Sequence, residues 1–337
     1  MNEIFLIKKT FKSKRKFKNK NHQKINKNFI LKFSIYLICL FSFICFFIYI
    51  VFHYRKKKEG FIDDKENINE VKIQNNFDNI KEEYSQDELT IVTGYYIMKS
   101  KHTFMEYYTR INNFVKLNHS MVFFTNKQFI NIIKEMRPQN LHNKTIFVEM
   151  EMEEFYSYKN FLKEFNYSFY IDSENSYHTL PLYLIWAEKC SFLKKVILKN
   201  YFKSKCFYWV DAGFFVELNS MDKYINWPST KKCLENSGVL MNLITPTSDS
   251  IKKGLINMDL EIHKNFQLIT NVFGGQPEKL LKFIDYYYES IRLFINYKIF
   301  IGKEQNIFAF IAYKYPDIIN LVYSGGSFTY FKDYLLN

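Results

Sequence analysis

The sequence predicts an α/β domain in which helices flank an open, mostly parallel sheet. Short apolar runs at residues 89–93, 121–125 and 145–149 alternate with helical stretches at 127–137 and 154–165. Continuous apolar runs of this length, separated by helices, are typical of buried strands in βα units. The first half of the large domain is therefore predicted to form one side of a parallel sheet.

A long helix is predicted next, from about residue 179 to residue 201. Thr179 is a suitable N-cap residue, and Pro181 falls in the first turn, where proline is well tolerated. The apolar run 206–210 that follows is predicted to be a further strand.

Two more helices are predicted near the C-terminus, at residues 277–297 and from about 304 to 315. Apolar residues in the first of them recur at helical spacing and are predicted to face the core. They are Leu280, Phe283, Ile284, Tyr287 and Ile291. The pair Gly274-Gly275 ends an apolar run just before this helix. Adjacent glycines let the backbone approach a ligand closely, although they are at least as common in ordinary turns.

One acidic residue stands where a buried strand is predicted to stop. Asp211 comes directly after the run 206–210 and is followed by Ala212 and Gly213. Ligands of open α/β sheets bind at the carboxyl ends of the strands, and a small neighbour leaves room for a phosphate or a hydrated ion. An aspartate that caps a turn explains the same pattern equally well.

The positive charge of the chain is concentrated at its N-terminus. The 337 residues carry a formal net charge of +13, and residues 1–32 contain eleven Lys or Arg against Glu3 alone, which is +10. The remaining residues are therefore only +3 together. So small a charge on the body gives no reason to expect a nucleic-acid partner.

An uncharged apolar segment follows the basic tail. Residues 33–52 contain no charged side chain, and a helix of that length spans roughly 30 Å, the thickness of the hydrocarbon core of a membrane. A cleaved signal peptide has a shorter apolar core and a small-residue cleavage site, and this segment has neither. We predict a basic tail at 1–32, a transmembrane helix at 33–54, a polar stem at 55–88 and one large domain at 89–337.

The charges beside this helix do not decide its orientation, because five Lys or Arg lie within about 15 residues on either side. A short tail of +10 is hard to translocate, so we predict a cytosolic N-terminus and a lumenal large domain, as in a type II signal-anchor protein. N-glycosylation sequons at Asn118, Asn143 and Asn166 suit this topology. An asparagine-rich chain also produces sequons by chance.

Cysteines are sparse in the large domain. It contains Cys190, Cys206 and Cys233, so at most one internal disulfide can form there, and no CxxC pair indicates a zinc site.

With these elements in order, the large domain resembles the HtrL/YibB-type family over roughly residues 89–330. The resemblance rests on five motifs, which are Thr90-Ile-Val-Thr-Gly-Tyr-Tyr96, Met121-Val-Phe-Phe-Thr125, Leu182-Tyr-Leu-Ile-Trp-Ala-Glu-Lys189, Phe207-Tyr-Trp-Val-Asp-Ala-Gly213 and Gly302-Lys-Glu-Gln305. That family is similar to nucleotide-sugar transferases of the GT-A fold. The resemblance therefore implies a GT-A-like fold, and the anchor and stem match the layout of secretory-pathway glycosyltransferases of the Golgi apparatus or endoplasmic reticulum.

The same resemblance assigns a metal-binding role to Asp211. It takes the place of the Asp-x-Asp of GT-A enzymes, with Gly213 where the second acid would be. A single carboxylate can still contribute to Mn²⁺ or Mg²⁺ held mainly by the diphosphate, because these ions keep water and substrate oxygens as ligands.

Seven further residues are implied to contact the donor. They are Thr93, Tyr95, Lys189, Gly274, Gly275, Glu304 and Gln305. The threonine and the tyrosine would contact the nucleotide, the lysine would neutralise the diphosphate, and the glycines would line the donor-sugar or acceptor side. The acid-glutamine pair would contact sugar hydroxyls. Ordinary alternatives are a solvated helix residue for the lysine and a first-turn acid favoured by the helix dipole for the glutamate.

The implied function is transfer of a sugar from a nucleotide-sugar donor to a glycan, protein or lipid acceptor, by a protein held in the membrane through one helix. The sequence identifies no catalytic base, because the acidic residues at 149–154 are better explained as a solvated loop. The alternative is a catalytically inactive GT-like or carbohydrate-binding membrane protein, which the loss of the second acid at Gly213 favours. A cytosolic-facing scaffold that uses its basic tail on anionic lipid is a weaker alternative.

Overall fold

The computed structural model describes residues 87–336 apart from 100–101, 217–220, 247 and 259–267. All of these residues belong to one compact unit, Glu82–Asn337. The predicted basic tail, transmembrane helix and nearly all of the predicted stem lie outside the described residues. Among the helices of the described part, none is long and apolar enough to cross a membrane.

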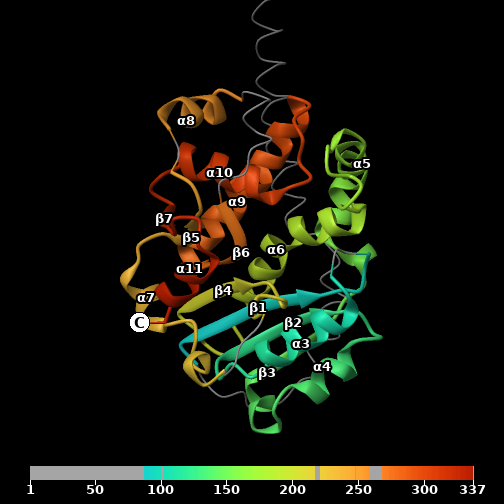
Figure 1. Cartoon of the computed structure of the whole chain (residues 1–337), viewed down its shortest axis with the longest axis vertical. Helices are drawn as coiled ribbons and strands as arrows, with labels where there is room; N and C mark the ends of the chain where they lie inside the picture. Colours follow the sequence, from blue (N-terminus) through green and yellow to red (C-terminus); the bar gives the residue numbers. More distant parts are fainter. Residues whose placement is uncertain (1–86, 100–101, 217–220, 247, 259–267, 337) are drawn as a thin grey trace, which may run out of the picture. The chain divides into compact units, whose positions relative to one another are not determined.

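A seven-stranded sheet forms the centre of the described domain (Figure 1). Its strands are β1 (Leu89–Tyr95), β2 (Ser120–Thr125), β3 (Thr145–Glu149), β4 (Cys206–Val210), β5 (Val239–Leu243), β6 (Leu268–Gly275) and β7 (Ile319–Tyr323). Their spatial order is β3-β2-β1-β4-β6-β5-β7, and of these seven strands only β6 runs antiparallel to its neighbours. The prediction of a mostly parallel α/β sheet is confirmed, with β6 as the exception that the sequence did not reveal.

Helices connect the strands and cover both faces of the sheet. Those of the first half are α3 (Phe104–Phe114), α4 (Ile130–Met136), α5 (Tyr156–Ile171) and α6 (Leu180–Lys199). Those of the second half are α7 (Thr230–Glu235), α8 (Asp249–Ile256), α9 (Pro277–Asn296), α10 (Glu304–Lys314) and α11 (Phe328–Tyr334). Short 3₁₀ turns are η1 (Gln139–Lys144), η2 (Met152–Glu154) and η3 (Asp222–Tyr224).

The long helix α6 begins and ends as its sequence predicts. Thr179 occupies the N-cap position and Pro181 lies in the first turn. The Thr179 side chain makes no capping hydrogen bond. Asn200 ends the helix in the left-handed conformation, with φ of 40°, as is common for a C-terminal asparagine. The apolar residues predicted to face the core from α9 are all buried.

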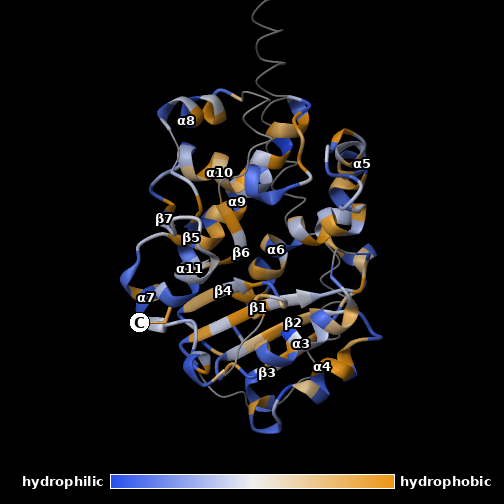
Figure 2. Cartoon of the chain, in the orientation of Figure 1, coloured by the Kyte–Doolittle hydropathy of each residue, from blue (hydrophilic) through white to orange (hydrophobic). Residues whose placement is uncertain are grey.

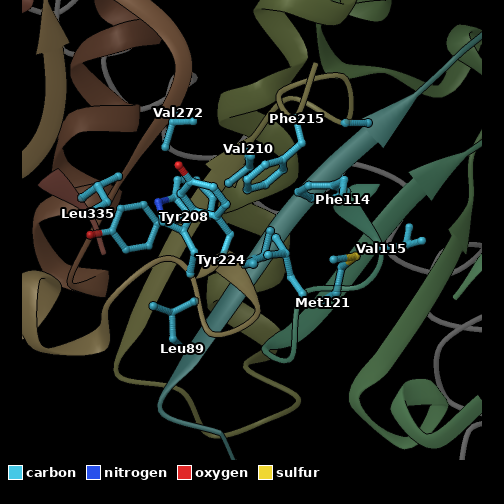
Figure 3. Close-up of a cluster of buried hydrophobic side chains, with 14 of the residues drawn as sticks. Leu89, Phe114, Val115, Met121, Tyr208, Val210, Phe215, Tyr224, Val272 and Leu335 are labelled. Atoms are coloured by element: carbon cyan, nitrogen blue, oxygen red, sulfur yellow. The ribbon is translucent and has the colours of Figure 1, made fainter. Parts of the chain in front are cut away.

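Side chains that alternate along the strands build a core on each face of the sheet. Leu89 and Ile91 of β1 belong to the cluster shown in Figure 3, which also contains Phe114 of α3 and Leu335 after α11. On the opposite face, Phe192 of α6 stacks on the sheet, and α9 and α10 complete that layer. Figure 2 shows mostly hydrophobic strands in the sheet and helices, such as α8, that mix hydrophobic and hydrophilic residues.

One disulfide ties the start of β4 to a neighbouring helix. Cys206 and Cys233 of α7 are bonded, with their Cα atoms 6.2 Å apart, and Cys190 is a buried free thiol. The large domain thus contains the single disulfide that three cysteines allow.

Candidate functional site

Four side chains converge at the edge of the sheet where the parallel strands end. Asp211 follows β4, Lys189 lies in the middle of α6, Glu304 begins α10 and Thr270 lies in β6. We call these four residues the lysine cluster. The chain builds the sheet outward in one direction from β1 through β2 and β3, and in the other direction from β4. The boundary between β1 and β4 is therefore a topological switch point, which is where open α/β sheets bind ligands.

Lys189 joins the two carboxylates of the cluster. Its Nζ lies 3.0 Å from Asp211 Oδ1 and 2.8 Å from Glu304 Oε1, and donates to the Thr270 carbonyl at 3.3 Å. Thr270 Oγ1 also donates to Glu304 Oε1, at 2.8 Å. Only 2% of the Lys189 side chain and 3% of the Glu304 side chain are exposed, against 36% for Asp211. Asp211 is therefore the member of the cluster that a ligand can reach.

An irregularity in β6 brings Thr270 into the cluster. β6 pairs with β5 at Ile269 and again at Phe273, opposite two adjacent β5 residues, so residues 270–272 have no partner on β5. With regular alternation Thr270 would face the same side as Val272, which belongs to the core on the α3 side. A bulge bends a strand and redirects a side chain. Here it turns Thr270 towards α10 on the other face.

Burial and charge act against each other within the cluster. Burial alone would lower the pKa of Lys189, but the carboxylates of Asp211 and Glu304 outweigh it and raise this pKa above its ordinary value. Loss of solvent raises the pKa of Asp211, against the opposing effects of the Lys189 ammonium and the Trp209 indole. Lys189 therefore stays charged at neutral pH, whereas ionised Asp211 has an energetic cost that a bound cation would reduce.

Asp211 can offer one ligand oxygen to a divalent cation. Its Oδ1 accepts from Trp209 Nε1 at 2.6 Å and lies nearest to Lys189, whereas the hydrogen bond from Lys189 to Oδ2 is longer, at 3.3 Å. Glu304 is held by Lys189 and Thr270, and Gly213 supplies no carboxylate. These residues fit an ion that takes one protein oxygen and keeps water and diphosphate oxygens as its other ligands.

A second group of side chains borders Gly213 from α3, and the sequence reasoning missed it. A Cβ atom on Gly213 would lie 3.0 Å from Tyr107 Cε1 and 3.7 Å from Arg110 Cδ. The rings of Tyr95 and Tyr107 are 5.4 Å apart, and the Arg110 guanidinium lies 5.8 Å from the Tyr107 ring. A half-buried cation and one phenol therefore border Gly213, two residues after Asp211, and a second phenol, Tyr95, packs against the first. The i, i+3 spacing of Tyr107 and Arg110 on the first helix after β1 was the available signal.

The structure places the two predicted nucleotide contacts inside β1 rather than after it. Thr93 is fully buried, level with Val210, and in the described part of the chain its Oγ1 has no hydrogen-bond partner. Tyr95 ends the strand and is half-buried, and burial together with Tyr107 raises its pKa to about 12. Its hydroxyl is therefore a hydrogen-bond donor at neutral pH.

The structure does not bring Gly274 and Gly275 to this site. Because β6 is antiparallel, its glycines pair with the start of β4, opposite Tyr208 and Phe207, at the edge away from Asp211. A Cβ on Gly274 would lie 2.2 Å from Tyr208 Cδ1, so close packing explains this glycine. The sequence reasoning placed both glycines near the donor, and the reversed direction of β6 puts them elsewhere.

The remaining predicted residues stay near the cluster or outside it. Gln305 is half-buried beside Glu304 at the start of α10. The burial of Lys189 excludes the alternative of a solvated helix residue. The acidic residues Glu149, Glu151, Glu153 and Glu154 are exposed, as predicted for a solvated loop.

Comparison with curated proteins finds no match for this chain. A family model described as "Bacterial protein of unknown function (HtrL_YibB)" matches residues 87–335. The match covers nearly all of the described domain, including both groups of side chains around Asp211. The chain therefore belongs to the HtrL/YibB family.

Proposed function

We propose that this protein is a membrane-anchored glycosyltransferase that moves a sugar from a nucleotide-sugar donor to a glycan, protein or lipid acceptor. The observation that carries the proposal is the lysine cluster at the switch point of the sheet. A buried ammonium there holds one carboxylate within the protein and a second, Asp211, where a ligand can reach it. The mostly parallel sheet supports the GT-A-like fold that this function implies.

The residues around Asp211 have the chemistry that the leaving group requires. Departure of a nucleoside diphosphate leaves negative charge on its oxygens, which cations and oriented donors stabilise. Mn²⁺ or Mg²⁺ bound through Asp211 would supply charge at the diphosphate. Arg110 borders Gly213 in the same turn, and Tyr95 packs against Tyr107 beside it. These two side chains would bind phosphate oxygens or the nucleotide. Lys189 would hold Asp211 in place, because its ammonium is already bonded to both acids.

The proposal includes a lumenal domain in the Golgi apparatus or endoplasmic reticulum, anchored by residues 33–54. Two observations support it. The Cys206–Cys233 disulfide suits an oxidising compartment, and the asparagines of all three sequons are exposed. Endoglycosidase treatment should lower the apparent mass, and extraction should require detergent. Solubility in carbonate, or protease protection of the basic tail instead of the domain, would contradict this topology.

A catalytically inactive, carbohydrate-binding protein is the second candidate. It is favoured by Gly213, which leaves one exposed acid, and by Lys189, which neutralises part of the charge that would attract a cation. Such a protein would bind sugar or nucleotide without turnover.

Calorimetry on the full chain, purified in detergent, tests the transferase proposal. UDP and GDP would each be titrated with and without Mn²⁺, and donor turnover followed with UDP-glucose, UDP-galactose and GDP-mannose. We expect Asp211→Asn to fold but to lose metal-dependent binding and most turnover, since a neutral amide is a poor ligand for a hard cation. Asp285→Asn removes an exposed carboxylate paired with Lys194. It should change neither metal-dependent nucleotide binding nor donor turnover. Unchanged metal-dependent binding in Asp211→Asn, or no nucleotide binding in the parent, would overturn the proposal.

A further inference from the structure

A histidine-aspartate pair, His178 and Asp172, lies in the loop between α5 and α6. Neither residue belongs to the lysine cluster. His178 Nδ1 is 2.7 Å from Asp172 Oδ2. The Tyr183 hydroxyl donates to the same oxygen, and the Glu174 N–H donates to Asp172 Oδ1 at 2.9 Å. The Asp172 side chain is 4% exposed and that of His178 is 15% exposed. The pair is thus held inside the protein but open to solvent on the histidine side.

These contacts select one tautomer of His178. Hydrogen bonds from His178, Tyr183 and the Glu174 N–H outweigh the effect of burial and lower the pKa of Asp172, so this carboxylate is ionised at neutral pH. An ionised carboxylate only accepts, so the neutral imidazole carries its hydrogen on Nδ1. Among the described residues nothing makes a hydrogen bond to Nε2. That nitrogen has a free lone pair and is the atom that can take a proton.

Two separate connections place this pair beside the lysine cluster. The His178 ring packs edge-on against Trp186 at 5.3 Å, and Trp186 precedes Lys189 by three residues, or about 4.5 Å of helix axis. On the other side, Lys303 donates to Glu174, and Lys303 is the residue directly before Glu304. Trp186, against which the imidazole packs, thus lies a little under one helical turn from Lys189 towards the N-terminus of α6. That offset suits a sugar lying between a diphosphate at Asp211 and an acceptor at His178.

We propose that His178 is the general base that activates the acceptor hydroxyl, an inference that rests on the proposed transferase function. Nε2 accepts the hydroxyl proton while the acceptor oxygen forms a bond to the anomeric carbon. The bond from that carbon to the diphosphate oxygen breaks, and its electron pair leaves with the nucleoside diphosphate. A single displacement of this kind inverts the anomeric configuration. Asp172 is a positioning residue, because it acts through His178 by fixing its tautomer and stabilising the imidazolium.

The same loop has an alternative use as a cation site, which its contacts disfavour. Ligand atoms of Asp172, Glu174 and His178 lie within 4.8 Å of one another. However, Asp172 already accepts from three donors, and Glu174 accepts from the Lys303 ammonium. A metal ion would have to displace a lysine and break the histidine pair. Both carboxylates of this loop therefore already have partners, Asp172 in His178 and Tyr183 and Glu174 in Lys303.

Hydrolysis of nucleotide sugars by the full chain tests the proposal, with water in place of the acceptor hydroxyl. The probes are UDP-glucose, UDP-galactose and GDP-mannose, and proton NMR identifies the anomer released first. His178→Asn keeps a side-chain N–H near the position of Nδ1, so the contact with Asp172 and the fold should survive. We expect its kcat to fall roughly 100-fold or more, the range for loss of a general base, with KM and UDP affinity within about threefold of the parent.

The pH dependence and matched variants separate this role from a structural one. A base works only when deprotonated, so the parent should show an acid limb in kcat that His178→Asn lacks. Asp172→Asn should lower kcat and change the imidazole tautomer seen by ¹⁵N NMR, whereas His142→Gln, which removes an exposed histidine bonded to backbone carbonyls, should do neither.

Three results of these assays would contradict the assignment of His178 as the general base. They are a kcat for His178→Asn within threefold of the parent, a product with retained configuration, and a parent that binds UDP but hydrolyses none of the three donors. Tight Zn²⁺ binding that His178→Asn abolishes would overturn it in favour of the cation site. Absence of both UDP and GDP binding in the parent would instead overturn the proposed function, so the two failures are distinguishable.

Discussion

The two edges of the sheet hold their polar groups in different ways. At the amino edge, Asp87 accepts from the backbone N–H groups of Leu89 and Ser120 at 3.2 Å and 2.9 Å, and a disulfide fixes the start of β4. At the carboxyl edge, the lysine cluster buries an ammonium and a carboxylate and leaves Asp211 partly exposed. The first arrangement joins adjacent strands. The second gathers three charged groups and one hydroxyl around one accessible acid.

This difference indicates that the carboxyl edge contributes less to the free energy of unfolding than the amino edge and has groups that can bind a ligand. Buried charged groups contribute little net stability, because removing them from water costs about as much as their attraction returns. The carboxyl edge and its surroundings also contain buried polar atoms without partners among the described residues, such as Thr93 Oγ1 and both amide atoms of Asn306. Most buried polar groups in proteins are paired, so unpaired ones near the carboxyl edge call for an explanation such as a bound molecule. Four experiments can break or sharpen the comparison.

The largest effect is expected from Lys189→Met. It leaves Glu304 buried without its ammonium, and breaking one side of a buried ion pair costs about 3 to 5 kcal/mol. Lys194→Met on the same helix removes a lysine from a solvent-exposed pair and should cost less than about 1 kcal/mol. Denaturant unfolding of the full chain in detergent measures both. Equal costs would show that the cluster is not held as tightly as its burial indicates.

Removal of the disulfide should have the next largest effect, at the other edge. The bond closes a loop with a sequence separation of 27, for which chain entropy gives about 3 to 4 kcal/mol. Cys206→Ala with Cys233→Ala should lower the melting temperature and make it insensitive to reducing agent. Cys190→Ala, which removes a free buried thiol, should keep that sensitivity. A parent whose melting is unaffected by reduction would contradict the role of the bond.

The glycines at the two ends of the β4–β6 region should respond differently to alanine. At Gly274 the new Cβ would meet Tyr208 Cδ1 at 2.2 Å and the Phe207 carbonyl at 2.6 Å, and overpacking of this kind costs about 2 to 3 kcal/mol. At Gly213 the nearest atom, 3.0 Å away, is on the Tyr107 side chain, which can move. Gly213→Ala should therefore cost less than Gly274→Ala in thermal unfolding. The reverse order would mean that the tighter packing is at the ligand edge.

Sequence reasoning succeeded where a feature depends on neighbouring residues. The strands with continuous apolar runs, the N-terminus of α6 at Thr179 and the acid at the end of β4 all follow from local patterns. The direction of β6 does not follow from a local pattern, because an apolar run looks the same in a parallel and an antiparallel strand. The antiparallel direction pairs Gly274 and Gly275 with Tyr208 and Phe207, at the edge away from Asp211.

The composition of the site was predictable in part. Asp211, Lys189 and Glu304 were named separately, but their contact depends on how α6, β4 and α10 pack. Thr270 enters through a bulge that the sequence does not mark. Arg110 and His178 were missed because no motif that carries the resemblance contains them. Arg110 lies on α3, the helix that follows the carboxyl end of β1, and His178 lies two residues before α6.

The smallest effect is expected from Asp87→Asn at the amino edge. The two carboxylate oxygens of Asp87 accept from two backbone N–H groups, and an amide can replace only one of these acceptors. We expect a loss of about 1.5 to 2 kcal/mol at neutral pH, in the lower part of the range for a hydrogen bond to a charged group. Donor turnover should not change, since this residue lies at the edge away from Asp211. Asp317→Asn, which alters an exposed acid, should be neutral within about 0.5 kcal/mol.

The pH dependence of that loss tests its origin. Burial would raise the pKa of Asp87, but hydrogen bonds and charge from His119, with the N–H groups of Ser120 and Leu89, lower it below 3.8. A carboxyl whose folded-state pKa is lowered contributes its full stability above the unfolded-state value and loses it as pH falls through the folded-state value. The difference in unfolding free energy between parent and Asp87→Asn should thus be constant near neutrality and shrink below about pH 4. A difference that stays constant down to pH 2 would show that shape, rather than the ionised carboxylate, holds β1 and β2 together at this edge.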